Sequence, residues 1–211
     1  MRCFVFLCVY NVAPYAVIWN TTTAANGSHG LKAVARDEAG NVATSEQIAF
    51  LVSNAPPPVA VNFSPYQYKK EKGAVLSGSV ASIAADDHSY LVVRSNTSGA
   101  VRTTRVAFDF KDLPAASTLT AATVNVAVKE SAPPATMRIS MWDYAISAWE
   151  QIDTVSLAGT SEALHSVRLS ASSFSSYLSS GGLARVQVVV DRWQSTTHDV
   201  SHDLVRLTLT Q

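Results

Sequence analysis

The chain has 211 residues, with 16 acidic and 16 basic side chains, 47% hydrophobic residues and only 15% charged residues. This length allows one large domain or two smaller ones, each with a buried core. The charge balance leaves no net field that would attract nucleic acid or anionic lipid, so neither is an expected partner. No long stretch repeats apolar residues at helical spacing, and the abundance of Ser, Thr and Val favours an all-β fold.

The N-terminal segment, residues 1–10, is apolar after Arg2 and fits either a core strand or a signal peptide. We favour the strand, because no clear cleavage site follows and residues 14–19 continue in a strand-like pattern. The apolar run is far shorter than the ~20 residues of a membrane helix, so membrane insertion is not expected. Cys3 and Cys8 would lie on opposite faces of such a strand, and we interpret both as buried hydrophobic residues rather than a disulfide.

Strand-like runs at residues 15–19, 31–36 and 48–52 alternate with turn sequences, including Asn26-Gly27 and Gly40-Asn41. This pattern predicts successive hairpins.

Four segments here resemble the bacterial Ig-like domains of secreted and surface proteins: Pro14-Tyr15, Trp19 to Thr22, Asn26 to His29 and Ala33 to Asn41. The resemblance implies that residues 1–53 are a partial Ig-like β-sandwich module. In that family two or more further strands precede the Pro-Tyr segment, so the module is expected to be shortened at its N-terminus. The resemblance therefore implies the C-terminal part of a larger multidomain bacterial protein that is secreted or displayed on the cell surface.

Residues 54–76 are predicted to form a linker. Pro56 to Pro58 fix φ and donate no backbone hydrogen bond, which favours a semi-rigid extended spacer. The polar run from Tyr66 to Lys72 is interpreted as a solvated approach to the next domain rather than a binding patch.

Short strands with period-two alternation are predicted from Ser77 to the C-terminus. Phe174, Tyr177 and Leu178 have helix-like spacing before two glycines, which predicts one short helical turn. Eight or nine strands with one such turn are typical of a two-sheet jelly roll. The predicted strands are residues 79–83, 90–95, 102–110, 122–129, 137–144, 150–155, 165–169, 184–190 and 204–210.

Residues 137–153 predict a hairpin with large aromatic side chains near its turn. The aliphatic side chains of the first strand lie on one face, and Arg138, Trp142 and Tyr144 lie on the other, with Trp149 after the turn. A flat ring can stack on the apolar C–H face of a sugar while polar neighbours bind its hydroxyl groups. The candidate glycan-binding residues are therefore Arg138, Trp142, Tyr144 and Trp149. The alternative is that these rings pack against a loop, and Trp193 is interpreted as packing.

Five segments resemble uncharacterised C-terminal β-sandwich domains of secreted bacterial proteins: Ser77 to Ser79, Asp86 to Val93, Met141 to Tyr144, Ala148 to Asp153 and Asp203 to Leu207. More distantly they are similar to jelly-roll carbohydrate-binding modules. The resemblance implies that residues 77–211 form a non-catalytic module that binds glycan or cell-wall polysaccharide. The alternative function is a structural or adhesive spacer that binds no small ligand.

Asp86, Asp87 and Asp203 are candidate ligands of a structural Ca²⁺ ion, provided that the first and last strands pair as they often do in jelly rolls. The alternative is turn hydrogen bonding and ordinary ion pairs with arginines such as Arg94. No other cofactor is expected. His198 and His202 are interpreted as part of a solvated loop.

Three glutamates, Glu130, Glu150 and Glu162, could supply an acid/base pair for glycoside hydrolysis, which needs two carboxylates about 5 to 10 Å apart. Nothing in the sequence brings any two of them together. No Gly-x-Ser-x-Gly motif, phosphate-binding loop or cysteine nucleophile occurs. We therefore expect no enzymatic activity.

Overall fold

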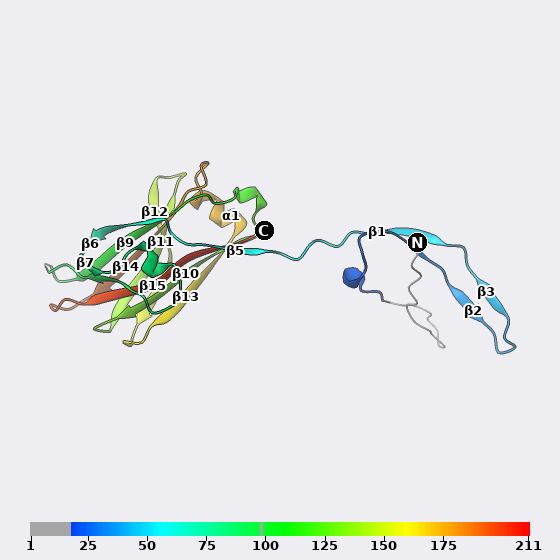
Figure 1. The fold of residues 1–211 in the computed structure, drawn as a ribbon, viewed down its shortest axis with the longest axis horizontal. Coiled ribbons are helices and arrows are strands. Elements are labelled where there is room, and N and C mark those ends of the chain that lie inside the picture. Colours follow the sequence, from blue (N-terminus) through cyan, green and yellow to red (C-terminus); the bar gives the residue numbers. More distant parts are fainter. Residues whose placement is uncertain (1–17, 98) are drawn as a thin grey trace. The chain divides into compact units, whose positions relative to one another are not determined.

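A computed structural model describes residues 18–97 and 99–211 of the chain. The expectations for the N-terminal strand and for the two cysteines lie outside these residues. The chain divides into two compact units, Met1–Pro57 and Pro58–Gln211 (Figure 1). The helices in the described part are too short to cross a lipid bilayer.

The first unit contains two short antiparallel ladders, between β1 (Gly27–Leu31) and β4 (Ile48–Val52) and between β2 (Val34–Arg36) and β3 (Val42–Thr44). A short 3₁₀ turn, η1 (Thr21–Thr23), precedes them and is capped by the side chain of Asn20. Val52 is the one fully buried hydrophobic residue among those described in this unit. The Ig-like assignment therefore stays a prediction.

Among the residues that the structure describes, the second unit contains eleven strands and four short helical segments. The strands are β5 (Ala60–Phe63), β6 (Gln67–Lys72), β7 (Ala74–Ser77), β8 (Leu91–Arg94), β9 (Arg102–Phe110), β10 (Ala121–Glu130), β11 (Ala135–Asp143), β12 (Ala148–Leu157), β13 (Ala163–Ser170), β14 (Ala184–Arg192) and β15 (Asp199–Thr210). Two of the helical segments, α1 (Ala171–Phe174) and η4 (Ser175–Tyr177), confirm the predicted helical turn. The other two are the 3₁₀ turns η2 (Val80–Ile83) and η3 (Ala116–Thr118).

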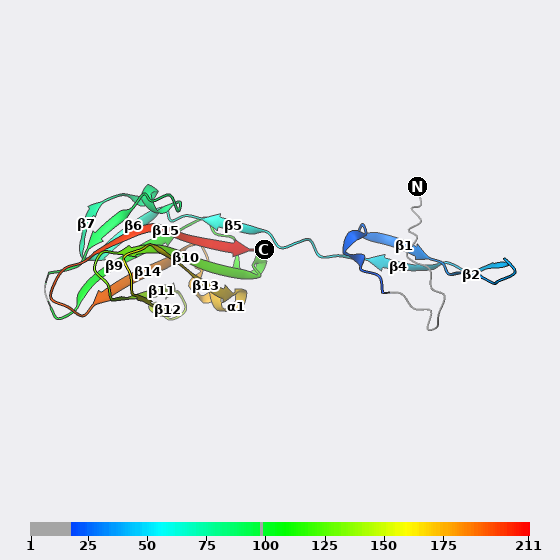
Figure 2. The same cartoon turned by 90° about the horizontal axis from the view of Figure 1, so that it is seen from below.

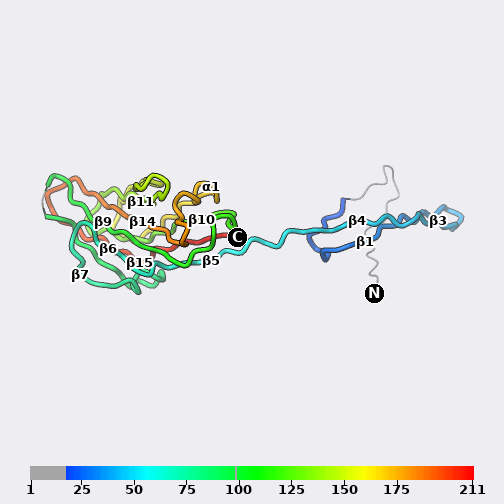
Figure 3. Tube along the Cα trace, turned by 90° about the horizontal axis from the view of Figure 1, so that it is seen from above, coloured from blue at the N-terminus to red at the C-terminus, as the bar shows by residue number. Residues whose placement is uncertain are grey.

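These strands form a β-sandwich of two antiparallel sheets (Figure 2). One sheet has the order β13-β10-β15-β8-β7, with β5 also paired to β15, and the other has the order β12-β11-β14-β9-β6. Strand β5 runs beside the last residues of β15, so the C-terminus lies next to the start of this unit (Figure 3).

The eight strands β8 to β15 have jelly-roll connectivity. When they are numbered one to eight along the chain, one sheet reads 1-8-3-6 and the other reads 2-7-4-5. The first of these strands, β8, pairs with the last, β15. The prediction of an all-β fold with a jelly-roll sandwich is thus confirmed.

The core lies between the two sheets because each strand has one apolar face. Val186, Val188 and Val190 of β14 are completely buried, and so are the alternating aliphatic residues Met137 to Met141 of β11. Burying one such side chain contributes about 1.5 to 3 kcal/mol. This apolar layer holds the two sheets together and fixes which side chains face outward.

The expected linker at residues 54–76 differs from the structure, because β5, β6 and the first residues of β7 lie within it. Strand β6 pairs with β9 at the edge of its sheet although it contains three lysines. Lysines are frequent on edge strands because they discourage pairing with another chain. A polar edge strand shows little apolar alternation, so the sequence pattern resembles a solvated connection.

The first strand predicted for the sandwich, at residues 79–83, is a 3₁₀ turn instead, η2 (Val80–Ile83). Ser79 begins it with a capping box, in which its side chain accepts from the Ala81 backbone N–H and Ser82 reciprocates. These local hydrogen bonds satisfy backbone donors without a neighbouring strand.

Candidate functional site

The predicted aromatic hairpin is present, and its indole rings lie on the outer face of the sandwich. Strands β11 and β12 pair antiparallel with Trp142 opposite Trp149. Because Met141 points into the core, Trp142 points away from it. The two rings meet edge to face, with centroids 5.4 Å apart and planes at 79°. Both side chains are half-buried.

The two tryptophans begin a row of side chains that crosses all five strands of this sheet. The strand registers place Arg185 opposite Asp109, and Asp109 opposite Gln67. The guanidinium carbon of Arg185 lies 5.8 Å from the ring centroid of Trp142 and 5.9 Å from that of Trp149. We call these residues the aromatic row: Trp149, Trp142, Arg185, Asp109 and Gln67.

Hydrogen bonds fix the polar members of the aromatic row. Arg185 Nε donates to Asp109 Oδ1 at 2.9 Å, and Gln67 Nε2 donates to the other carboxylate oxygen at 2.8 Å. The hydrogen bond with Asp109 raises the pKa of Arg185 above its usual value. The row therefore presents one fixed positive and one fixed negative charge, which cancel, beside two apolar rings.

Two tyrosines lie beside the aromatic row. The hydroxyl of Tyr66 accepts from Gln67 Nε2 at 3.1 Å, and the ammonium group of Lys111 lies 5.3 Å from the Tyr66 ring centroid. Tyr144 follows the end of β11 and is half-buried. Burial raises the pKa of Tyr144, the charge of Arg185 opposes this, and the charge of Asp109 adds to it. The charges of two members of the row thus act in opposite directions on the pKa of Tyr144.

Arg138 lies on the same face but is held away from the row. It stands four positions before Trp142 on β11 and forms a short charge-assisted hydrogen bond with Asp191. Arg185 is the cation beside the indole rings, and sequence reasoning missed it. The alternating valines of β14 indicate that Arg185 faces outward, but only the pairing of β14 with β11 and β9 places it beside Trp142.

The interpretation of Trp193 as a packing residue is wrong. Its side chain is 76% exposed, the most exposed of the aromatic residues that the structure describes. It directly follows Arg192, at the end of β14 remote from Arg185. An exposed indole outside the row provides a useful comparison for the two indoles within it.

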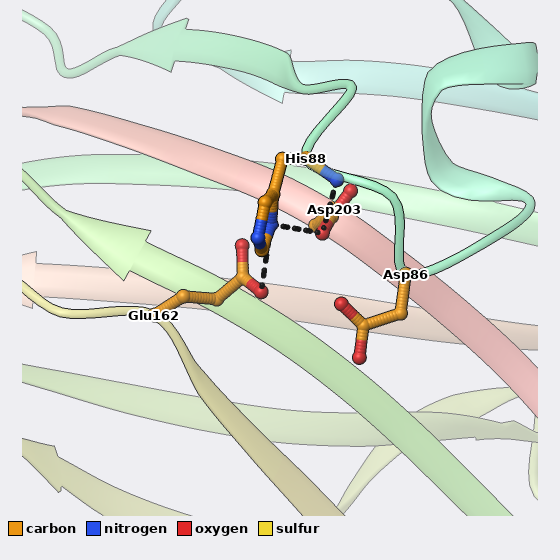
Figure 4. Close-up of side chains that lie close together, drawn as sticks. All are labelled: Asp86, His88, Glu162 and Asp203. Carbon is orange, nitrogen blue, oxygen red and sulfur yellow. Dashed lines mark hydrogen bonds and ion pairs between the residues drawn. The ribbon is translucent and has the colours of Figure 1, made fainter.

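A second group of polar residues converges from three distant segments (Figure 4). Asp86 and His88 lie in the loop before β8, Glu162 lies between β12 and β13, and Asp203 lies in β15. One possible ligand atom from each residue lies within 4.8 Å of all the others. We call these four residues the acidic cluster. Burial raises the pKa of Glu162, the Tyr90 hydrogen bond lowers it, and the nearby charges of Asp203 and Asp86 raise it further.

Asp87, which we expected to join Asp86 and Asp203, lies outside the acidic cluster. Its Oδ1 accepts from the backbone N–H of Ser89 at 3.0 Å in a local turn. Asp199 likewise forms two hydrogen bonds with Arg94, at 2.7 and 2.8 Å, and this contact lowers the pKa of Asp199. Turn bonding and arginine pairing thus account for these two aspartates.

The interpretation of His198 and His202 as part of a solvated loop is wrong, because both side chains are buried. Strand β15 begins at Asp199, earlier than predicted. His202 faces the core, with its ring centroid 5.6 Å from that of Phe108, and neither ring nitrogen has a hydrogen-bond partner among the described residues. Burial lowers the pKa of His202 to about 4.

The three glutamates weighed for hydrolysis lie in different places. Glu130 is buried against His198, and Glu150 accepts a 2.8 Å hydrogen bond from the Tyr177 hydroxyl. Glu162 belongs to the acidic cluster, in which Asp203 is completely buried. The structure therefore does not bring any two of the three together.

No family model and no curated protein sequence matches the chain. Several solved carbohydrate-binding modules are similar to it in structure. One of them is a family 61 module that was solved in complex with β-1,4-galactotriose. It has 11% sequence identity and a TM-score of 0.40, and the alignment covers 71% of this chain and 87% of the module's chain. A module of family 27 that recognises mannan has 14% identity over 73% of this chain and 99% of its own, with a TM-score of 0.39. A mutant module of family 29 has 6% identity over 71% of this chain and 92% of its own, with a TM-score of 0.41. At such identities and TM-scores the likeness does not indicate the ligand of this chain.

Proposed function

We propose that the second unit is a non-catalytic module that binds glycan or cell-wall polysaccharide through the aromatic row. The observation that carries this proposal is the outward orientation of Trp142 and Trp149 on adjacent strands. Two indoles on the solvent side of a sheet add nothing to the apolar layer between the sheets. Their half-exposed rings offer apolar area on which a sugar ring can stack.

The polar part of the row suits a neutral ligand with many hydroxyl groups. Arg185, Asp109 and Gln67 are held by hydrogen bonds to one another, so little rotamer entropy is lost when a ligand binds them. The guanidinium group supplies donors and the carboxylate supplies acceptors, and their charges cancel. Half-buried Tyr144, whose pKa is influenced by the charge of Arg185, adds a hydroxyl group. This combination favours an uncharged polysaccharide over an anionic one.

The proposal includes no catalysis. Glu130 and Glu150 already have hydrogen-bond partners, and the carboxylate of Asp109 is held by Arg185 and Gln67. A polysaccharide ligand also suits an exported protein. The proposal therefore extends to a secreted or cell-surface bacterial protein in which an Ig-like first unit connects this module to further domains.

The test is retention of the whole chain on a panel of neutral and anionic polysaccharides in affinity gels, followed by calorimetry with the best ligand. Trp142→Ala and Trp149→Ala should each weaken binding by at least about tenfold, because truncated aromatic anchors commonly cost more than about 1.4 kcal/mol. Trp193→Ala is the matched control and should bind like the parent protein. Equal binding by all three variants would remove the aromatic row from the interaction.

A structural or adhesive spacer is the second candidate, and the half-burial of both indoles favours it over a fully exposed platform. In that case Trp142 and Trp149 stabilise the edge of the sheet through their mutual contact and through Arg185. If the protein is a spacer, no polysaccharide in the panel should retard the parent protein in the gel. Trp142→Ala should nevertheless be less thermally stable than the parent protein.

A further inference from the structure

The acidic cluster depends on an irregularity in β15. Val128 of β10 pairs with His202, and the preceding Ala127 pairs with Leu204, so Asp203 is an extra residue in a β-bulge. Before the bulge, Val200 and His202 face the core, whereas after it Val205, Leu207 and Leu209 do. The bulge therefore switches the core-facing positions of the strand from even to odd residue numbers. It also turns Asp203 toward the loop that contains His88 (Figure 4).

Asp203 contributes a buried carboxylate of which one oxygen has a hydrogen-bond partner among the described residues and the other has none. Its side chain is 0% exposed, and Oδ2 accepts from the backbone N–H of His88 at 3.0 Å. The other oxygen, Oδ1, has no hydrogen-bond partner among the residues that the structure describes. A buried charged oxygen without a partner is costly, so a cation or donor placed beside this atom would stabilise the folded unit.

The cluster lacks a protein cation that could compensate three carboxylates. In the described part of the chain, no lysine or arginine forms an ion pair with Asp86, Glu162 or Asp203, whereas the carboxylates of Asp109, Asp191 and Asp199 each pair with an arginine. Among the described residues, the base that lies within 4 Å of these carboxylates is the imidazole of His88. Like charges this close are expected to repel one another unless a cation lies between them.

The spacing of the ligand atoms fits a small divalent ion. His88 Nδ1 lies 3.5 Å from Asp203 Oδ2 and 3.8 Å from Glu162 Oε1. Ligands about 2.0 to 2.1 Å from a tetrahedral ion are about 3.3 Å from one another. The cluster therefore needs only small side-chain movements to surround one ion, and Asp86 supplies the fourth oxygen.

We propose that Asp86, His88, Glu162 and Asp203 bind a divalent transition-metal ion, with Zn²⁺ as the best fit. The imidazole ligand decides against Ca²⁺, which takes six to eight oxygen ligands, whereas one nitrogen with carboxylate oxygens suits zinc-like ions. The ion connects the loop before β8 to the segment after β12 and to β15, three parts of the chain separated by more than 40 residues each. Its function is structural: it fixes the loop and neutralises the cluster.

The test uses the whole chain after treatment with a chelator, titrated with ZnCl₂, CaCl₂ and CoCl₂ by calorimetry and thermal denaturation. One equivalent of Zn²⁺ should bind, and an excess of about 100-fold over its Kd should raise Tm by about 5 to 10 °C. Co²⁺ should give the intense visible absorption of a four-coordinate site. His88→Asn removes the nitrogen ligand yet tolerates the left-handed backbone of this position, where φ is +64°. It should weaken Zn²⁺ binding by at least about tenfold.

Asp203→Asn should have the same effect, and its amide oxygen can still accept from the His88 N–H. Asp87→Asn is the matched control, because Asp87 is the neighbouring aspartate outside the cluster, and it should bind Zn²⁺ like the parent protein. Binding of Ca²⁺ that is unaffected by His88→Asn would overturn the transition-metal assignment. Undiminished Zn²⁺ binding by both His88→Asn and Asp203→Asn, or no Zn²⁺ binding by the parent protein, would overturn the site. Polysaccharide binding is not involved in any of these readouts.

Discussion

The Nδ1 atom of His198 lies 2.8 Å from Oε2 of Glu130, and both side chains are completely buried. Nε2 of the same ring lies 3.2 Å from the backbone oxygen of Arg102, and Glu130 also accepts from the Ala132 backbone N–H. The pair thus connects the end of β10 and the start of β15 to β9 of the opposite sheet.

We expect Glu130→Ala to lower the free energy of unfolding of the sandwich by about 3 kcal/mol, because it leaves a buried imidazole without its partner. Urea denaturation followed by tryptophan fluorescence measures this change. Lys129→Ala is the matched control on the same strand, and as an exposed position it should change stability by less than about 0.5 kcal/mol. Similar values for the two variants would contradict the importance of the buried pair.

His202 should make the sandwich sensitive to acid. Its folded-state pKa of about 4 lies below the usual 6.5, so the unfolded state binds the proton more readily. Stability is therefore complete above pH 6.5 and falls as the pH drops from 6.5 toward 4, by about 3 kcal/mol in all. His202→Leu should remove this part of the pH dependence in urea titrations made in the presence of a chelator. A parallel pH profile for the parent protein and the variant would rule out His202 as its source.

Tyr177 should ionise only at very alkaline pH. Burial and the hydrogen bond to Glu150 raise its pKa from 10.0 to about 12. The folded state retains this proton longer than the unfolded state, so the stabilising contribution is complete below pH 10 and is lost as the pH rises toward 12. An ultraviolet titration of the parent protein minus that of Tyr177→Phe isolates this transition, and the variant should be about 1 kcal/mol less stable at neutral pH. If the difference between the two titrations showed a transition near pH 10, the Tyr177 hydroxyl would not lie in this buried, hydrogen-bonded environment.

Gly78 is required by the backbone before η2. Its φ is +89°, and a Cβ atom would lie 2.2 Å from the backbone oxygen of Tyr90. Gly78→Ala should therefore destabilise the sandwich by more than about 2 kcal/mol, as a melting-temperature shift would show. Gly99 has a similar φ of +92° but ample space, so Gly99→Ala should cost only about 1 kcal/mol. Equal shifts would mean that the close contact with Tyr90 can relax.

Local alternation determined the strands of the sandwich well. In β9, β10 and β14 the core-facing apolar residues alternate over five to seven positions, because each strand buries one face, and the observed bounds differ from the predicted ones by no more than two residues. The same alternation put Trp142 on the face opposite the core residues of its strand. Polar segments were harder: β6 and the start of β15 are strands because of their neighbours in the sheet, and their own sequences do not show it.

The candidate sites needed the tertiary structure. Parity placed Arg185 on an outer face, but strand register alone put it between Trp142 and Asp109, and register depends on pairing between distant segments. The acidic cluster is assembled from a loop, a second connection and a β-bulge, and the bulge turns Asp203 toward that loop only through the pairing of β15 with β10. The amino-acid sequence by itself determined the β-class, the alternating faces and the position of Trp142 opposite the core residues of its strand, because these follow from local side-chain chemistry. Which polar groups meet, and which histidines are buried, was decided by the packing of the two sheets.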